Sequence, residues 1–210
     1  MVSKWAPLSG IAFLVLLAAG ALYGGKPPSE KGLESPELLA AAYVTQADRL
    51  SVAVFVMGVS LVFLVYFGSV LKTALDAGSA ATGCLSRAAF AGVIIFAVGA
   101  ATDFTVMLAM VEGAKDKVDP LVIQTLSTYF ENDWVPFAVG ILTLTSASAI
   151  SIVKYGGAPK WLGWLAALVA VVGLIPPIGW LALPGAGIWI LLASIMLTLQ
   201  AGKTHTPPAM

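Results

Sequence analysis

Asp103 is an ionisable residue near the middle of a long apolar run, residues 88–111. A charged side chain at the centre of a bilayer costs at least ~2.5–3.5 kcal/mol on insertion scales. No Lys, Arg or His lies at a comparable depth in the other apolar runs, so no buried ion pair offsets this cost. Because desolvation favours the neutral form of a carboxyl group, we expect Asp103 to be protonated at neutral pH unless water reaches it.

The helical neighbours of Asp103 predict that it points into a helix bundle. Gly92 and Gly99 share its face at helical spacing, and glycines allow two helices to approach closely. The next apolar run carries many hydroxyl groups that could accept or donate a hydrogen bond. We therefore define a candidate intramembrane proton or ion site formed by Asp103, Thr143, Thr145 and Ser146. The alternative is an interhelical hydrogen bond that only fixes packing, which is worth about 0.6 kcal/mol on average.

A second group of carboxyl groups lies in the polar segments between the apolar runs: Glu112, Asp116, Glu131 and Asp133. Clustered carboxylates can bind a hard cation such as Ca²⁺. The spacing does not match a calcium-binding loop, so the sequence favours a solvated acidic surface and predicts no metal site. Catalysis on a lipid headgroup by these carboxylates is the less favoured alternative.

Other catalytic groups are sparse. The one histidine, His205, lies in a polar tail, and the one cysteine, Cys84, lies between apolar runs. Neither a nucleophile elbow nor a phosphate-binding glycine loop occurs. We expect no cofactor, and a non-enzymatic role is favoured.

The composition indicates a membrane protein. Of the 210 residues, 59% are hydrophobic and 10% are charged, which excludes an ordinary soluble enzyme and a nucleic-acid-binding protein. Because a spanning helix needs about 20 apolar residues, we predict one all-α membrane domain, residues 1–210, with about six spans. The expected spans are 8–24, 50–71, 88–111, 134–153, 161–175 and 185–201.

Prolines and cap residues define the other elements. Pro176, Pro177 and Pro184 predict a short turn between the last two spans. Ser35-Pro36 and Asp119-Pro120 predict two short interfacial helices, 36–47 and 120–129, in the two long loops. The first span could instead be a cleaved signal peptide, which would leave five helices, but its long apolar run favours a retained helix.

The distribution of basic residues predicts the orientation. One side of the expected bundle carries six Lys and Arg residues and one acid, and the other carries five cations and nine acids. The six cations lie close to the ends of spans, where they influence orientation most. We therefore expect both termini in the cytoplasm. The six are Lys4, Lys72, Arg87, Lys154, Lys160 and Lys203.

The last third of the chain carries the stretch Ala158-Pro159-Lys160-Trp161-Leu162-Gly163-Trp164-Leu165, followed by Pro176-Pro177. This stretch resembles a family of bacterial integral membrane proteins of unknown function, common in actinobacteria, whose fifth helix opens with a similar motif. The resemblance implies six helices in a bacterial inner membrane. It implies no activity and no site residue.

Three functions are consistent with the sequence. The first is a non-enzymatic interaction or accessory protein that packs against lipid or another membrane subunit. The second is a small proton- or cation-coupled transporter that uses Asp103, for which six helices would require a homo-oligomer. The third is a membrane-surface enzyme that uses the carboxyl groups of the loops.

Overall fold

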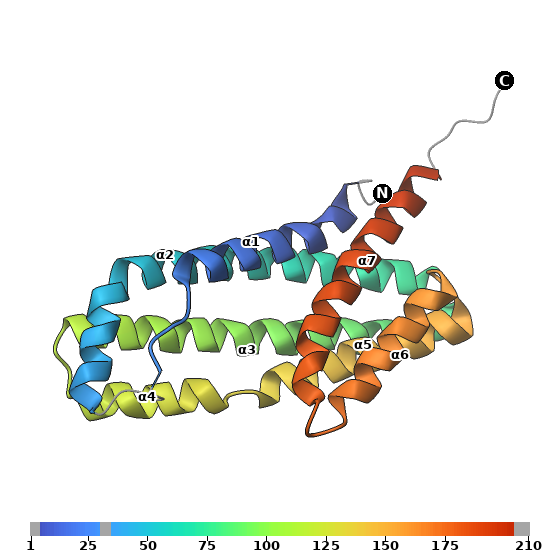
Figure 1. Ribbon diagram of the computed structural model, residues 1–210. Helices are drawn as coiled ribbons and strands as arrows, with labels where there is room; N and C mark the ends of the chain where they lie inside the picture. Colours follow the sequence, from blue (N-terminus) through green and yellow to red (C-terminus); the bar gives the residue numbers. More distant parts are fainter. Residues whose placement is uncertain (1–4, 30–34, 204–210) are drawn as a thin grey trace.

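The computed structural model describes residues 5–29 and 35–203, which form helices and turns without a strand (Figure 1). Predictions for Lys4 and His205 lie outside the described residues. The all-α bundle predicted from the sequence is confirmed. Its helices are α1 Ser9–Gly24, α2 Pro36–Asp76, α3 Gly83–Lys115, α4 Pro120–Asn132, α5 Val135–Tyr155, α6 Lys160–Gly173 and α7 Ala182–Lys203, with 3-10 turns η1 Ala6–Leu8, η2 Ala80–Thr82 and η3 Gly179–Leu181.

The helices indicate a multi-pass membrane protein. Five segments of the described chain are long and apolar enough to cross a bilayer. The remaining predicted span, 161–175, forms α6, which has 14 residues and is shorter than the roughly 20 that cross a bilayer core at right angles. The five segments are Ala6–Gly24, Pro36–Asp76, Gly83–Lys115, Pro120–Tyr155 and Gly179–Gln200.

The prediction of a separate helix over 36–47 is wrong, because these residues are the first turns of α2. No glycine or proline separates Ala47 from Leu50, so nothing ends the helix there. Figure 1 shows these first turns crossing the end of the bundle toward α4, at a steep angle to the rest of α2. The predicted N-cap is confirmed, since the Leu38 backbone N–H donates to Ser35 Oγ at 3.4 Å.

The predicted helix over 120–129 is confirmed as α4, with the Leu121 backbone N–H donating to Asp119 Oδ1 at 3.0 Å. α4 packs against α2 and α3 at one end of the bundle. A small apolar cluster holds this end together, and it contains Leu39, Tyr43, Met107, Met110 and Ile123.

In the main bundle, α2 packs beside α1 and α3, and α5 packs beside α3 and α6. The predicted close approach at Gly92 is confirmed. A Cβ atom built on Gly92 would lie 2.4 Å from the Leu144 backbone nitrogen, and one on Gly140 would lie 2.7 Å from the Phe96 backbone nitrogen. α3 and α5 therefore contact backbone to backbone, which fixes the register of every side chain along the two helices.

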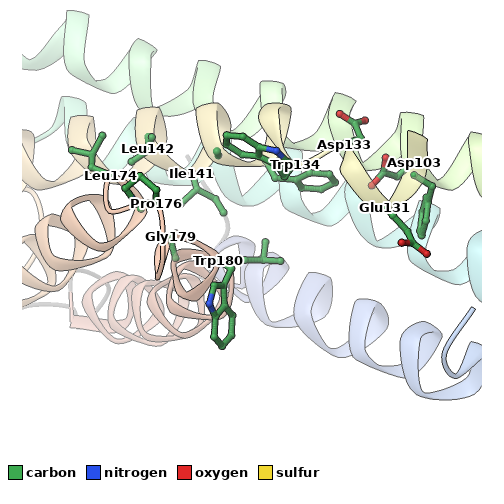
Figure 2. A pocket seen from close by; sticks show the side chains of 16 residues that line it. Asp103, Glu131, Asp133, Trp134, Ile141, Leu142, Leu174, Pro176, Gly179 and Trp180 are labelled. Atoms are coloured by element: carbon green, nitrogen blue, oxygen red, sulfur yellow. The ribbon is translucent and has the colours of Figure 1, made fainter. Parts of the chain in front are cut away.

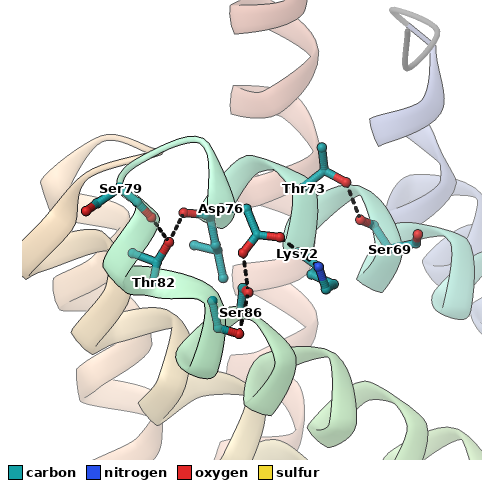
Figure 3. A network of polar contacts seen from close by, with 9 residues as sticks. Ser69, Lys72, Thr73, Asp76, Ser79, Thr82 and Ser86 are labelled. Carbon is teal, nitrogen blue, oxygen red and sulfur yellow. Dashed lines mark hydrogen bonds and ion pairs between the residues drawn. The ribbon is translucent and has the colours of Figure 1, made fainter.

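The turn between α2 and α3 is held by polar contacts (Figure 3). Lys72 Nζ pairs with Asp76 Oδ2 at 2.7 Å, and the Ser86 hydroxyl donates to the other oxygen of the same carboxylate. The Thr82 hydroxyl donates to the Leu75 carbonyl at 3.0 Å. These bonds tie the last turn of α2 to the first turn of α3 and keep the two helices antiparallel.

The proline-rich segment between α6 and α7 is a turn, as predicted. α6 ends at Gly173, and α7 begins at Ala182 with Pro184 in its first turn, where a missing N–H costs no hydrogen bond. This turn returns the chain to the start of α5, where it forms one wall of the site described next.

Candidate functional site

A cavity of about 700 Å³ lies where α5 begins, between that helix and the α6–α7 turn (Figure 2). Ligand-binding cavities in proteins commonly measure about 300–1,000 Å³, so this one is large enough for a small molecule. Its lining comes from four parts of the chain: Asp103 of α3; Phe130, Glu131, Asp133 and Trp134 at the α4–α5 junction; Phe137, Ala138, Ile141 and Leu142 of α5; and Gly173, Leu174, Pro176, Gly179, Trp180, Ala182 and Leu183 around the turn.

The break between α4 and α5 brings Asp133 to the cavity. α4 ends at Asn132 and α5 begins at Val135, with Pro136 in its first turn. Pro136 packs on Gly99, where a built Cβ atom would lie only 2.6 Å from the proline Cβ. Asp103 is one helical turn beyond Gly99 on α3, so it lies level with the residues just before Pro136.

The carboxyl groups of Asp103 and Asp133 are neighbours at the acidic end of the cavity (Figure 2). Asp103 Oδ1 is buried and has no hydrogen-bond partner among the described residues. Asp133 Oδ2 accepts a hydrogen bond from the Tyr129 hydroxyl at 3.1 Å. Because adjacent carboxylates repel each other, the pair is favourable when it shares a proton or when a cation neutralises it.

The walls of the cavity are apolar and aromatic. Trp134 and Trp180 are largely exposed, at 67% and 70%, so they form an open rim rather than part of the packed core. Phe137 is held by an edge-to-face contact with Phe96, with ring centroids 5.3 Å apart. Glu131 adds a third carboxyl group, and no Lys, Arg or His is among the described residues that line the cavity.

The structure does not bring the predicted hydroxyl partners to Asp103. Thr145 Oγ1 donates to the Ile141 carbonyl at 2.7 Å and Ser146 Oγ to the Leu142 carbonyl at 2.5 Å, so both bond within their own helix. Thr143 is their neighbour on α5. Leu144 packs against Gly92, which is eleven residues, or about 16 Å, from Asp103 along α3.

The predicted acidic cluster divides into two groups. Glu131 and Asp133 line the cavity, whereas Glu112 and Asp116 lie at the far end of α3. Glu112 Oε1 pairs with Lys115 Nζ at 3.0 Å, and Asp116 is the C-cap residue of α3. Within residues 5–29 and 35–203, no three His, Cys, Asp or Glu side chains are grouped closely enough to hold a metal ion.

Sequence reasoning missed the pairing of Asp103 with Asp133. The available signal was Trp134-Val135-Pro136, because a proline two residues after an interfacial tryptophan marks a helix start and places Asp133 at that junction.

Comparison with known proteins gives no relative: no known protein family, curated protein or solved structure matches this chain. Function is therefore inferred from the cavity and its carboxyl groups.

Proposed function

We propose that this integral membrane protein binds a small lipid-soluble molecule in the cavity at the start of α5. The observation that carries the proposal is the cavity itself, with about 700 Å³ of space, aromatic walls and a buried carboxyl oxygen at one end. Such a combination of apolar surface with a few convergent polar groups is typical of ligand sites. Binding is also the step that a small transporter using Asp103 would need.

The position of the cavity supports access from the bilayer. Trp180, Leu174 and Leu183 are exposed side chains of its rim, on the outside of the bundle. In a membrane, the molecules that meet such a rim are lipids and solutes dissolved among them. Binding requires no covalent step, so this function agrees with the non-enzymatic role favoured by the sequence.

The setting is part of the same proposal. We place the protein in a bacterial inner membrane with both termini in the cytoplasm. The basic residues Lys72, Arg87 and Lys154 at one end of the bundle support this orientation, because cytoplasmic loops are enriched in Lys and Arg. A transporter of this size would act as a homo-oligomer.

The proposal is tested by photolabelling the purified protein in phosphatidylcholine nanodiscs with a diazirine-bearing octanol. We expect adducts, located by mass spectrometry, to concentrate on peptides that contain residues 134–142 and 174–183. Ala138→Phe should reduce them at least threefold, because Ala138 lines the cavity and a phenyl ring fills part of its volume.

The matched control is Val139→Phe. Val139 is the next residue of α5, is 45% exposed and does not line the cavity, so the same ring added there should leave the adducts unchanged. Adducts spread evenly over all exposed helix faces, or equal labelling of both variants, would contradict the proposal.

A further inference from the structure

We infer that the ligand of this cavity is an amphipathic organic cation, with an ammonium head that binds between Asp103 and Asp133 and an apolar body that lies along α5. The inference rests on the proposed function and names the chemical class of its ligand. Two features carry it: the charge of the lining and the aromatic character of the walls.

The charged groups that line the cavity are carboxyl groups, from Asp103, Glu131 and Asp133. They come from two different elements, α3 and the α4–α5 junction, and meet at one end. A fatty acid or another anion would face the carboxyl groups of Asp103 and Asp133 there, and no Lys, Arg or His is among the described residues that line the cavity. Charge complementarity therefore selects a cation.

The unsatisfied oxygen of the carboxyl pair favours a cation that carries an N–H hydrogen-bond donor. Asp103 Oδ1 is buried without a donor, and a buried acceptor left unsatisfied is costly. The Tyr129 hydroxyl donates its hydrogen bond to Asp133 Oδ2, so it does not satisfy Asp103 Oδ1. An N–H group of an ammonium head can supply the missing hydrogen bond, and its single positive charge neutralises the pair when the two carboxyl groups share one proton.

The aromatic side chains favour the same ligand. Trp134, Phe130 and Phe137 line the same cavity as the carboxyl groups. The faces of aromatic rings attract cations through their quadrupole, most strongly for tryptophan. The rest of the lining, including Ile141 and Leu183, suits an apolar tail.

The test uses three competitors with the same eight-carbon tail: octylammonium, octanol and octanoate. Each is added to the diazirine–octanol labelling reaction in phosphatidylcholine nanodiscs, whose zwitterionic surface does not concentrate cations. We expect octylammonium to halve the cavity adducts at a concentration at least tenfold lower than octanol, and octanoate to be the weakest. Charge-assisted hydrogen bonds account for a ratio of this size.

Two variants locate the effect. Asp133→Asn and Asp103→Asn should each lower the advantage of octylammonium over octanol to less than threefold. Octanol should still compete in both variants, which shows that the cavity remains folded. The control is Glu112→Gln, which removes a carboxylate at the far end of α3 and should leave the tenfold ratio unchanged.

The outcomes separate the two claims. Equal competition by octylammonium and octanol, or stronger competition by octanoate, would overturn the assignment of a cationic ligand. The cavity would then bind a neutral or an anionic ligand instead. An unchanged octylammonium advantage in both aspartate variants would also overturn it. Absence of any cavity adduct in the wild-type protein would overturn the proposed function, and the ligand class with it.

Discussion

Replacing Gly92 by alanine is expected to lower the free energy of unfolding by about 3 kcal/mol or more. The added Cβ atom would lie 2.4 Å from the Leu144 backbone nitrogen and 2.7 Å from the Gly140 carbonyl oxygen. Neither backbone atom can move aside without separating α3 from α5. For a chain of this length we expect the melting temperature in detergent to fall by roughly 6–12 °C, measured by differential scanning fluorimetry.

Gly58→Ala is the matched control, because a Cβ atom on Gly58 meets nothing within 4 Å. Alanine has the higher helix propensity, so this variant should be neutral or more stable by up to about 1 kcal/mol. Gly140→Ala tests the opposite side of the contact and should resemble Gly92→Ala, since its Cβ would lie 2.7 Å from the Phe96 backbone nitrogen. Equal stability of the Gly92 and Gly58 variants would contradict the α3–α5 register on which the site depends.

Replacing Trp189 by alanine is the second change with a large expected effect. Trp189 of α7 is fully buried, and its Nε1–H donates to the Leu162 carbonyl of α6 at 2.9 Å. Removing a buried indole leaves a cavity and costs about 3–5 kcal/mol in soluble proteins. The same loss of packing is expected here, measured as a lower melting temperature, because packing contacts drive helix association within a bilayer.

Two variants separate the causes of that loss. Trp189→Phe keeps most of the volume and removes the hydrogen bond, so it should cost about 1 kcal/mol. Trp180→Ala removes an indole that is 70% exposed and should change stability by less than about 0.5 kcal/mol. If Trp180→Ala destabilised the protein as much as Trp189→Ala, the packing of α6 on α7 would not be as the structure has it.

Local features of the structure could be predicted from the sequence, because their causes are local. Ser35 and Asp119 cap helices as expected, and the turn after α6 follows from Pro176 and Pro177. The seven-residue spacing of Gly92 and Gly99 predicts that both lie on one face of α3, and both glycines contact α5.

The candidate site could be predicted only in part, because its geometry depends on register between helices. The apolar residues 88–111 predict that Asp103 lies near the middle of a span, and it does lie near the middle of α3, Gly83–Lys115. The contact of Gly99 with Pro136 sets Asp103 level with Asp133 instead of with the hydroxyls of α5. Neither segment alone predicts that alignment, because it depends on how α3 and α5 pack against each other.

The first helix, α1, packs against the rest of the bundle. α1 lies along α2, where a Cβ atom on Gly20 would meet Met57 Cγ at 2.6 Å and one on Gly24 would meet Ala53 Cβ at 2.7 Å. Phe13 is buried in the main core.

The central claim is that the cavity connects the apolar surroundings of the bundle to Asp103. It is tested most directly with dicyclohexylcarbodiimide, an apolar reagent that modifies protonated carboxyl groups in apolar surroundings, applied to membranes between pH 5 and 9 and followed by mass spectrometry. We predict that Asp103 is modified and that Ala138→Phe reduces the modification severalfold, whereas Val139→Phe does not. An Asp103 that stays unmodified throughout this range would contradict the claim, because the carboxyl group would then be sealed from the cavity.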